Sequence, residues 1–296
     1  MDILHHAMTG AVGAMALGQA GEPLAGAAFL VASVAPDMDS LVALRSNFAY
    51  LSAHQGISHG IGAAAILAAI AFLGCGAGGL GIDAVPVAIA AFAGVAIHAG
   101  LDLANTRGVA ILSPFSKKRL RLDAAFFVDP ISWCVLILAA GAVILAKSPW
   151  PALVGLAAQA AQLAVRALVA ENVRRRTGFE RALPDPIRPW KWHLTRAEDD
   201  GSTTIATADA FGMIGESKVI PAASPTASAA LEASASRRGL GAFPIRLAIV
   251  EEAPTLGGGT LIVARDVAMR PFGSRYGEIS IELDAKGRKI HESCRI

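Results

Sequence analysis

The stretch Val85–Leu103 reads VPVAIAAFAGVAIHAGLDL, a nearly continuous apolar run that contains one histidine and one aspartate. A run of about 20 apolar residues is long enough to cross the hydrocarbon core of a bilayer as a helix. His98 and Asp102 are four residues apart, so a helix places both side chains on one face. Ionisable side chains within such a helix are costly and mark functional sites. The stretch therefore predicts a membrane helix that carries a functional polar pair.

The composition of the whole chain agrees with a membrane protein. Of its 296 residues, 54% are hydrophobic and only 17% are charged, whereas soluble domains have about 25% charged residues. The net charge of +2 gives no footprint for nucleic-acid binding. The three cysteines are far apart and form no CxxC motif, which excludes a zinc ribbon and a thioredoxin-like site. A disordered chain and a secreted disulfide scaffold are excluded as well.

Apolar segments predict a mainly α integral membrane helical bundle of about six helices in the first part of the chain. They are Ile3–Leu17, Leu24–Ala35, His59–Gly74, Val85–Leu103, Ile131–Ala146 and Ala152–Val169. The second segment is short enough to be a re-entrant or half-spanning helix. We therefore expect a membrane-embedded metal-site domain over residues 1–170.

After residue 170 the chain becomes charged, rich in Ser and Thr, and interrupted by Pro. We expect a basic, Pro-rich linker over residues 171–189 and a C-terminal, cytoplasmic β-rich soluble domain over residues 190–296. Alternation and β-branched residues predict its strands, which are Trp190–Arg196, Thr203–Ala208, Pro244–Val250, Thr260–Arg265 and Glu278–Leu283. This tail shows no convergent catalytic residues, so we expect the chemistry in the membrane half.

The distribution of Lys and Arg predicts the orientation in the membrane. The loop Ala104–Pro130 and the stretch after the sixth segment are basic, whereas the loop Cys75–Ala84 has no positive charge. Basic loops stay in the cytoplasm. The sequence thus predicts a multi-pass protein with both termini cytoplasmic.

Histidines and aspartates gather at the predicted cytoplasmic ends of the apolar segments. The candidate metal ligands are His6, Asp37, Asp39, His54, His59, His98 and Asp102. Singly, each has a structural explanation: Asp39 suits a helix cap, and His98 with Asp102 suits a buried pair that joins helices. If these residues had independent structural roles, nothing would place them all at the same depth on one side of the membrane. Ligands of one metal centre must lie together, so a metal centre explains their common depth.

The ligand types indicate which ions the site would hold. Zinc takes about four ligands, and seven nitrogen and oxygen donors suit a two-metal centre. We expect two divalent ions, with zinc favoured and with manganese or iron compatible with the same donors.

Several ordered motifs accompany these residues. They are Met1-Asp2-Ile3-Leu4-His5-His6, Pro36-Asp37-Met38-Asp39, His54-Gln55-Gly56-Ile57-Ser58-His59-Gly60, His98-Ala99-Gly100-Leu101-Asp102, Asn105-Thr106-Arg107-Gly108 and Ser113-Pro114-Phe115-Ser116. The pattern over residues 1–135 resembles the YdjM-like family of bacterial inner-membrane proteins, which are predicted metal-dependent hydrolases. The third motif departs from the family pattern, with Gln55, Ser58 and Gly60 in place of Arg, Thr and Ser. The resemblance implies that His6 rather than His5 is the ligand.

These features predict a membrane-bound metal-dependent hydrolase. Its expected substrate is a phosphoester of a membrane lipid or lipid-linked compound at the cytoplasmic face, with no nucleic-acid partner. Asp39 or Asp102 would act as general base, and Asn105 would contact the substrate or a ligand. The alternative is a metal-ion transporter or sensor that uses the same residues, and a purely structural metal clamp is a third possibility. The sequence specifies no oligomeric state.

Overall fold

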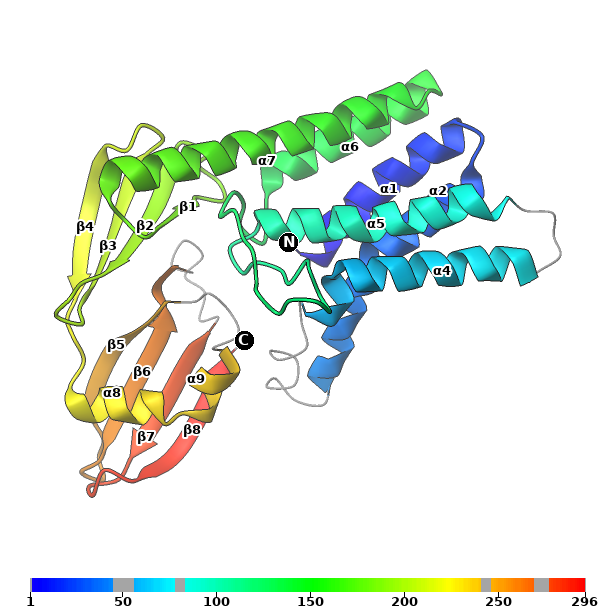
Figure 1. The fold of residues 1–296 in the computed structure, drawn as a ribbon. Helices are drawn as coiled ribbons and strands as arrows, with labels where there is room; N and C mark the ends of the chain where they lie inside the picture. The colour runs from blue at the N-terminus through cyan, green and yellow to red at the C-terminus, as the bar shows by residue number, and fades with distance from the viewer. Residues whose placement is uncertain (1, 45–55, 78–82, 241–245, 269–276, 296) are drawn as a thin grey trace. The chain divides into compact units, whose positions relative to one another are not determined.

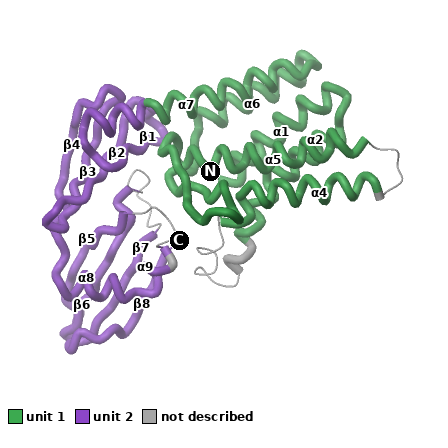
Figure 2. The backbone as a smooth tube through the Cα atoms, viewed as in Figure 1, with its two compact units in different colours: residues 1–42, 53–168 green, residues 43–52, 169–296 purple. Residues whose placement is uncertain are grey.

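The computed structural model describes residues 2–44, 56–77, 83–240, 246–268 and 277–295. It divides into two compact units (Figure 2). Unit 1 comprises Met1–Val42 and Ala53–Leu168, and unit 2 comprises Ala43–Ser52 and Val169–Ile296. Each unit has its own core.

Unit 1 is helical. Its elements are α1 (Ile3–Gln19), α2 (Pro23–Val34), the 3-10 helices η1 (Ala35–Leu44) and η2 (Ile57–His59), α4 (Ile61–Ala77), α5 (Ala84–Ala104), α6 (Pro130–Ala146) and the first two thirds of α7 (Trp150–Thr177). Figure 1 shows α5 beside α2 and α4. Aspartates cap the helix starts: Asp2, Asp83 and Asp129 accept hydrogen bonds from backbone N–H groups of the first turns of α1, α5 and α6.

Small residues bring α2, α4 and α5 close together. Ala32, Ala64, Ala91 and Val95 form one buried cluster between these three helices. Gly94 of α5 faces the backbone of α2, where an added Cβ would lie 2.6 Å from the carbonyl oxygen of Phe29. Such close approach is typical of helices that pack through small residues. It holds the C-terminal end of α5 next to the end of α2.

The prediction of a six-helix integral membrane bundle is wrong. Each of the six apolar segments contains a helix, but within the described residues only α5 and α7 are long and apolar enough to cross a membrane. The helices α4 and α6 are apolar but shorter, and α1 and α2 have only 17 and 12 residues. The physical reason is length, because a helix rises 1.5 Å per residue and the hydrocarbon core is about 30 Å thick.

Unit 2 contains two antiparallel four-stranded sheets. The first has the order β1 (Arg181–Pro184), β2 (Lys191–Ala197), β3 (Thr203–Asp209) and β4 (Ile214–Ile220). The second has the order β5 (Leu247–Pro254), β6 (Thr260–Asp266), β7 (Glu278–Leu283) and β8 (Lys289–Arg295). Consecutive strands pair in both sheets, so the two are simple meanders.

Helices cover one face of each sheet. Ala170 and Val173, near the end of α7, pack on Trp192 and Leu194 of β2. The short helices α8 (Pro225–Glu232) and α9 (Ala235–Leu240) pack on the second sheet, where Leu231 and Leu240 contact a core that includes Ile262, Ile279 and Ile281. The stretch expected as a linker, 171–189, carries the end of α7 and β1.

Candidate metal centre

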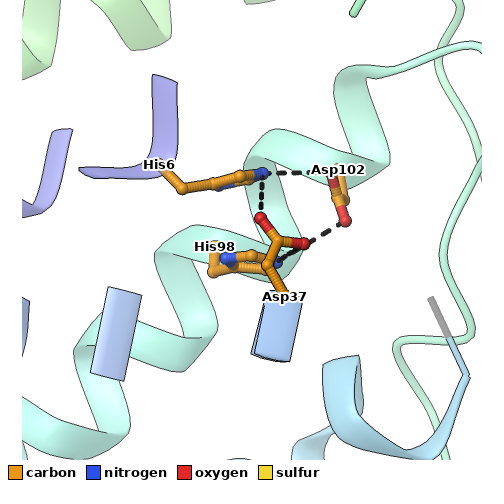
Figure 3. A group of neighbouring side chains, drawn as sticks. All are labelled: His6, Asp37, His98 and Asp102. Atoms are coloured by element: carbon orange, nitrogen blue, oxygen red, sulfur yellow. Dashed lines mark ion pairs between the residues drawn. The ribbon is translucent and has the colours of Figure 1, made fainter. Parts of the chain in front are cut away.

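Residues from four separate segments of unit 1 converge on one buried point. His6 lies in the first turn of α1, Asp37 in η1, His59 at the end of η2, and His98 and Asp102 in the last two turns of α5. Figure 3 shows four of them, His6, Asp37, His98 and Asp102. All five are buried, and the most accessible, Asp37, is only 5% exposed. Removing carboxylates and imidazoles from water is costly, so such groups are buried only when they are paired or hold an ion.

The imidazole nitrogens and carboxylate oxygens face one another at short range. His6 Nε2 lies 3.3 Å from Asp102 Oδ1 and 4.0 Å from Asp37 Oδ2. His59 Nε2 lies 3.4 Å from both Asp37 Oδ1 and Asp102 Oδ2. His98 Nε2 lies 3.6 Å from Asp37 Oδ1 and 3.7 Å from Asp102 Oδ2. Ligands about 2.0–2.1 Å from a tetrahedral zinc ion are about 3.3 Å from one another, so these separations suit donors around a common ion.

The orientation of the His98 ring is fixed by a hydrogen bond on the side that points away from the cluster. Its Nδ1 lies 2.8 Å from the carbonyl oxygen of Ser33 in α2. A carbonyl only accepts, so Nδ1 carries the proton, and the Nε2 lone pair faces the two carboxylates. Within the described residues this Nε2 has no hydrogen-bond partner. The ring of His98 also stacks on that of His6, with 3.7 Å between centroids. Backbone carbonyls commonly orient metal-binding histidines in this way.

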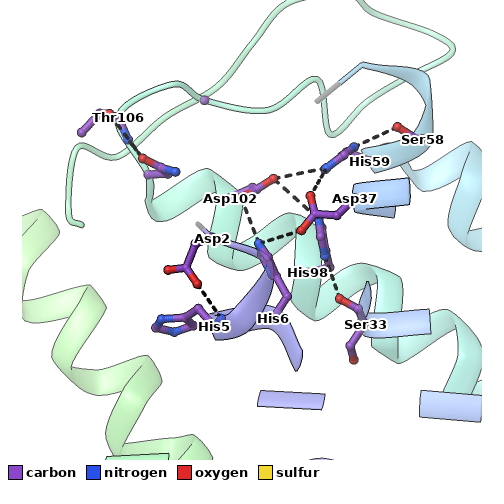
Figure 4. A network of polar contacts seen from close by, with 12 residues as sticks. Asp2, His5, His6, Ser33, Asp37, Ser58, His59, His98, Asp102 and Thr106 are labelled. Carbon is purple, nitrogen blue, oxygen red and sulfur yellow. Dashed lines mark hydrogen bonds and ion pairs between the residues drawn. The ribbon is translucent and has the colours of Figure 1, made fainter. Parts of the chain in front are cut away.

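His59 has carboxylates on both sides of its ring. Figure 4 shows its Nε2 facing Asp37 and Asp102, and on the other side its Nδ1 lies 3.4 Å from Asp39 Oδ2. Ser58 Oγ donates a hydrogen bond to Asp39 Oδ2 at 2.7 Å and lies 2.9 Å from His59 Nδ1. Asp39, predicted as both ligand and base, therefore contacts the ring edge of His59 that points away from Asp37 and Asp102. This is the position of a residue that orients a ligand.

The environment favours the protonation states that metal binding requires. Burial raises the pKa of the Asp37 carboxyl, but the hydrogen bond with His59 and the nearby His98 and His6 outweigh burial and leave this pKa below its ordinary value. Burial lowers the pKa of the His6 imidazole below its ordinary 6.5. A carboxylate and a neutral imidazole are the ligand forms of these side chains.

The predicted site residues thus separate into four groups, of which Asp39, beside the far edge of the His59 ring, is one. His6, Asp37, His98 and Asp102 offer donor atoms that all lie within 4.8 Å of one another, and His59 joins them. His54 lies outside the described residues. Asn105 is fully buried at the end of α5, and its Oδ1 accepts hydrogen bonds from the backbone N–H and the hydroxyl of Thr106 at 2.6 and 3.3 Å.

His5 has a different environment from His6. Its Nε2 lies 2.7 Å from Nε2 of Gln159 in α7, which also donates to Thr9 Oγ1 at 3.2 Å. In a separate contact, Arg166 of α7 pairs with the Asp129 cap of α6 at 3.0 Å. These contacts join α1 and α6 to α7. Of the two adjacent histidines, only His6 faces the cluster.

Sequence reasoning missed two supporting groups, the Ser33 carbonyl and the Ser58 hydroxyl. Ser58 is adjacent to His59 in a histidine-containing motif, and that adjacency is a signal that it contacts the site. A backbone carbonyl has no residue signature, so the contribution of Ser33 has no equivalent signal.

Comparison with known proteins agrees with the resemblance found in the motifs. A family model described as YdjM inner membrane protein matches residues 1–173, which include every described residue of the cluster. No curated protein and no solved structure matches the chain. Since the match covers more than half of the 296 residues, the chain belongs to the YdjM inner membrane protein family.

Proposed function

We propose that this chain is a membrane-bound metal-dependent hydrolase that cleaves a phosphoester of a lipid or lipid-linked compound at the cytoplasmic face of the membrane. The observation that carries the proposal is the convergence of three imidazoles and two carboxylates, all 5% exposed or less, from four segments of unit 1. So many ionisable groups at one buried point are expensive unless they serve a site.

The side chains suit the parts of such a reaction. A divalent ion at this site would supply Lewis acidity toward a phosphate oxygen and an activated water. His6, His59, His98, Asp37 and Asp102 would hold it. For the general base, Asp102 has both carboxylate oxygens directed at the cluster, at His6 and at His59. The side chain of Asp39 is more exposed, at 10% against 1%, but it contacts the far edge of the His59 ring, so we assign the base to Asp102 and the orientation of His59 to Asp39.

A basic loop beside the site supports an anionic lipid as substrate. The stretch Ile111–Ser113 pairs with the start of α4, where Ile61 N donates to Ile111 O at 2.9 Å and Gly62 N donates to Ser113 O at 3.1 Å. Directly after it, Phe115 is 87% exposed, and Lys117 and Lys118 are exposed as well. An aromatic and two lysines at a membrane boundary attract anionic headgroups.

The Lys and Arg distribution also supports our proposed topology. We place the loop around Lys118 and both termini in the cytoplasm, with an even number of crossings before and after Lys118. In this arrangement α5 needs a partner crossing, and the shorter apolar helix α4 packs against it. About 17 residues is the lower end of the spanning range.

Elemental analysis of the purified protein tests the metal centre. We expect about two zinc-type ions per wild-type chain on the two-metal reasoning, and a loss of bound metal in His98→Ala. If only one ion is bound per chain, the site consists of a single ion held by the five described donor residues. Equal metal content in both proteins, or none in either, would end the metal-site proposal, and bound metal without hydrolysis of any phosphoester would favour a transporter or sensor.

A further inference from the structure

A mostly apolar cavity of about 440 Å³ adjoins the metal centre. Its walls come from the start of η1, η2, the first two turns of α4, α5 and the loop at Pro114; they include Pro36, Ile57, Ser58, Ala63, Ile66 and Val95. Ser58 contributes the one side-chain hydroxyl among these lining residues. The space is large enough for several methylene groups and offers them apolar contacts.

Two residues connect this cavity directly to the polar cluster. Pro36 precedes the ligand candidate Asp37 in η1. Ser58 lines the cavity, and its hydroxyl also donates to Asp39 and lies 2.9 Å from His59 Nδ1. A bound molecule with a polar head at His59 and Asp37 would therefore reach the cavity with its next few atoms.

The residues that follow the cavity lining in the chain indicate the kind of molecule. Pro114 lines the cavity, and the exposed Phe115, Lys117 and Lys118 follow it within four residues. Two lysines this close in the chain to an apolar cavity wall complement an anionic headgroup attached to a hydrocarbon chain. Ile57 and Ile66 on the cavity wall are 74% and 64% exposed, so the cavity opens along an apolar surface.

From this geometry we infer that the cavity is the subsite for an acyl chain of an anionic phospholipid whose phosphoester lies at the metal centre. The inference rests on the proposed hydrolase function and specifies its substrate. Ile57, Ile66 and Ala63 contact the chain, and Ser58 lies at the junction between chain and head.

Binding of linear alkylphosphonates tests this subsite without requiring turnover. The probes run from ethyl- to octylphosphonate, and the protein is the full chain in nanodiscs loaded with zinc, with empty nanodiscs as the blank. Each methylene that enters the cavity should tighten binding about fourfold, which corresponds to about 0.8 kcal/mol per buried methylene.

Two substitutions should weaken this chain-length dependence. Ala63→Phe fills the cavity and Ile66→Ala removes part of its wall. Each should weaken octylphosphonate binding at least tenfold and leave ethylphosphonate binding within twofold of wild type. The matched controls are Ala65→Phe and Ile70→Ala on α4; both positions are exposed and lie outside the cavity lining, and Ile70 is 60% exposed, close to Ile66. The controls should keep the full chain-length dependence.

The outcomes separate this inference from the proposed function. If ethylphosphonate binds but longer chains bind no better, or if the controls lose the dependence as much as the cavity variants, the subsite is wrong while the metal site stands. If a branched prenyl phosphonate shows the steep dependence and linear chains do not, the acyl assignment is wrong. If no phosphonate binds the zinc-loaded protein, both the subsite and the phosphoesterase proposal fail.

Discussion

Two adjacent histidines show how strongly the role of a residue depends on where its side chain points. His5 and His6 are both fully buried in the first turns of α1. Successive residues of a helix point about 100° apart. His5 therefore contacts Gln159 of α7, whereas His6 faces Asp37 and Asp102.

This difference gives a matched pair of substitutions. We expect His6→Ala to lower zinc affinity by more than about 100-fold, because the loss of residues that merely orient ligands costs about 10–100-fold. His5→Ala should keep the bound metal and lower the free energy of unfolding by about 1–3 kcal/mol, since the Gln159 amide loses a buried partner. Metal titration and denaturant unfolding measure the two effects. Equal metal loss in both variants would contradict our assignment of His6.

At the scale of elements, the contact between α2 and α5 positions His98. Gly94 lies one turn before His98 on the buried face of α5, and Ser33, whose carbonyl holds the His98 ring, lies on α2. A Cβ at Gly94 would meet Phe29 O at 2.6 Å and Ser33 N at 3.1 Å, so α2 would have to move.

We therefore expect Gly94→Ala to weaken zinc binding by about tenfold, through the displaced Ser33 carbonyl, and to destabilise unit 1 by about 1–3 kcal/mol. Gly100→Ala is the control on the same helix, because a Cβ there meets nothing within 4 Å. It should leave zinc binding unchanged and stabilise the helix by about 0.5–1 kcal/mol. Isothermal titration with zinc checks both variants, and weaker binding in Gly100→Ala would argue against a specific effect of the α2 contact.

A second element-scale prediction concerns β8 and α9 of unit 2. Glu292 of β8 accepts hydrogen bonds from Ser234 Oγ at 2.7 Å and Ser236 N at 2.8 Å, and its other oxygen lies 2.5 Å from Lys289 Nζ. Burial raises the pKa of Glu292, but these contacts outweigh burial and lower the pKa from 4.5 to about 2. The group therefore stabilises the fold fully above its unfolded pKa and loses this contribution as the pH falls from 4.5 toward 2.

Glu292→Gln should accordingly lower the free energy of unfolding by about 1.5–3 kcal/mol at neutral pH. The difference from wild type should shrink as the pH is lowered below the ordinary pKa of glutamate. Denaturant unfolding followed by the β-sheet circular dichroism signal measures it. Glu251→Gln at an exposed position of β5 is the control, and a Glu292→Gln difference that is the same at every pH would contradict the linkage.

The strands also show which elements the sequence reveals. All five segments with alternating or β-branched patterns contain strands, and the three strands that this pattern missed, β1, β4 and β8, are edge strands. An edge strand pairs on one side only and tolerates polar and exposed residues, as in the burial of β4, where six of seven residues are exposed. The pattern therefore predicted all four central strands but, of the four edge strands, only β5.

At the scale of the whole molecule, the proposed topology predicts which segments lie on each side of the membrane. We expect reporter fusions at Lys118 and at Ile296 to report a cytoplasmic location and a fusion at Gly79 to report the outer face, from the Lys and Arg asymmetry. The amount of each fusion recovered in the membrane fraction is the control for insertion. An outer location for Lys118 would put the C-terminal end of α5, with His98 and Asp102, on the other side and would rule out a cytoplasmic substrate.

The candidate site was more predictable than the number of membrane helices. The four-residue spacing of His98 and Asp102 fixes a shared helix face, and the motifs around His6, Asp37 and His59 mark the residues that join them. Apolar segments do not fix the number of membrane helices in this way, because an apolar helix face packs equally well against lipid or against another helix. The short segment that became α2 packs Phe29 and Ala32 inside unit 1, and hydropathy alone does not distinguish that burial from insertion in a bilayer.

The close approach of α1, α2 and α5 has a genetic consequence. Every missense change at a glycine codon adds a Cβ, and an added Cβ would lie 2.3 Å from the Phe29 ring at Gly13, 2.8 Å from Ala14 O at Gly26 and 2.6 Å from Phe29 O at Gly94. No single replacement at these positions is sterically silent. A smaller residue at position 29 could relieve the clash at Gly13, but at Gly26 and Gly94 the nearest atom is a backbone oxygen, which no side-chain replacement removes. The helices that carry His6 and His98 are therefore sensitive to mutation at positions outside the cluster.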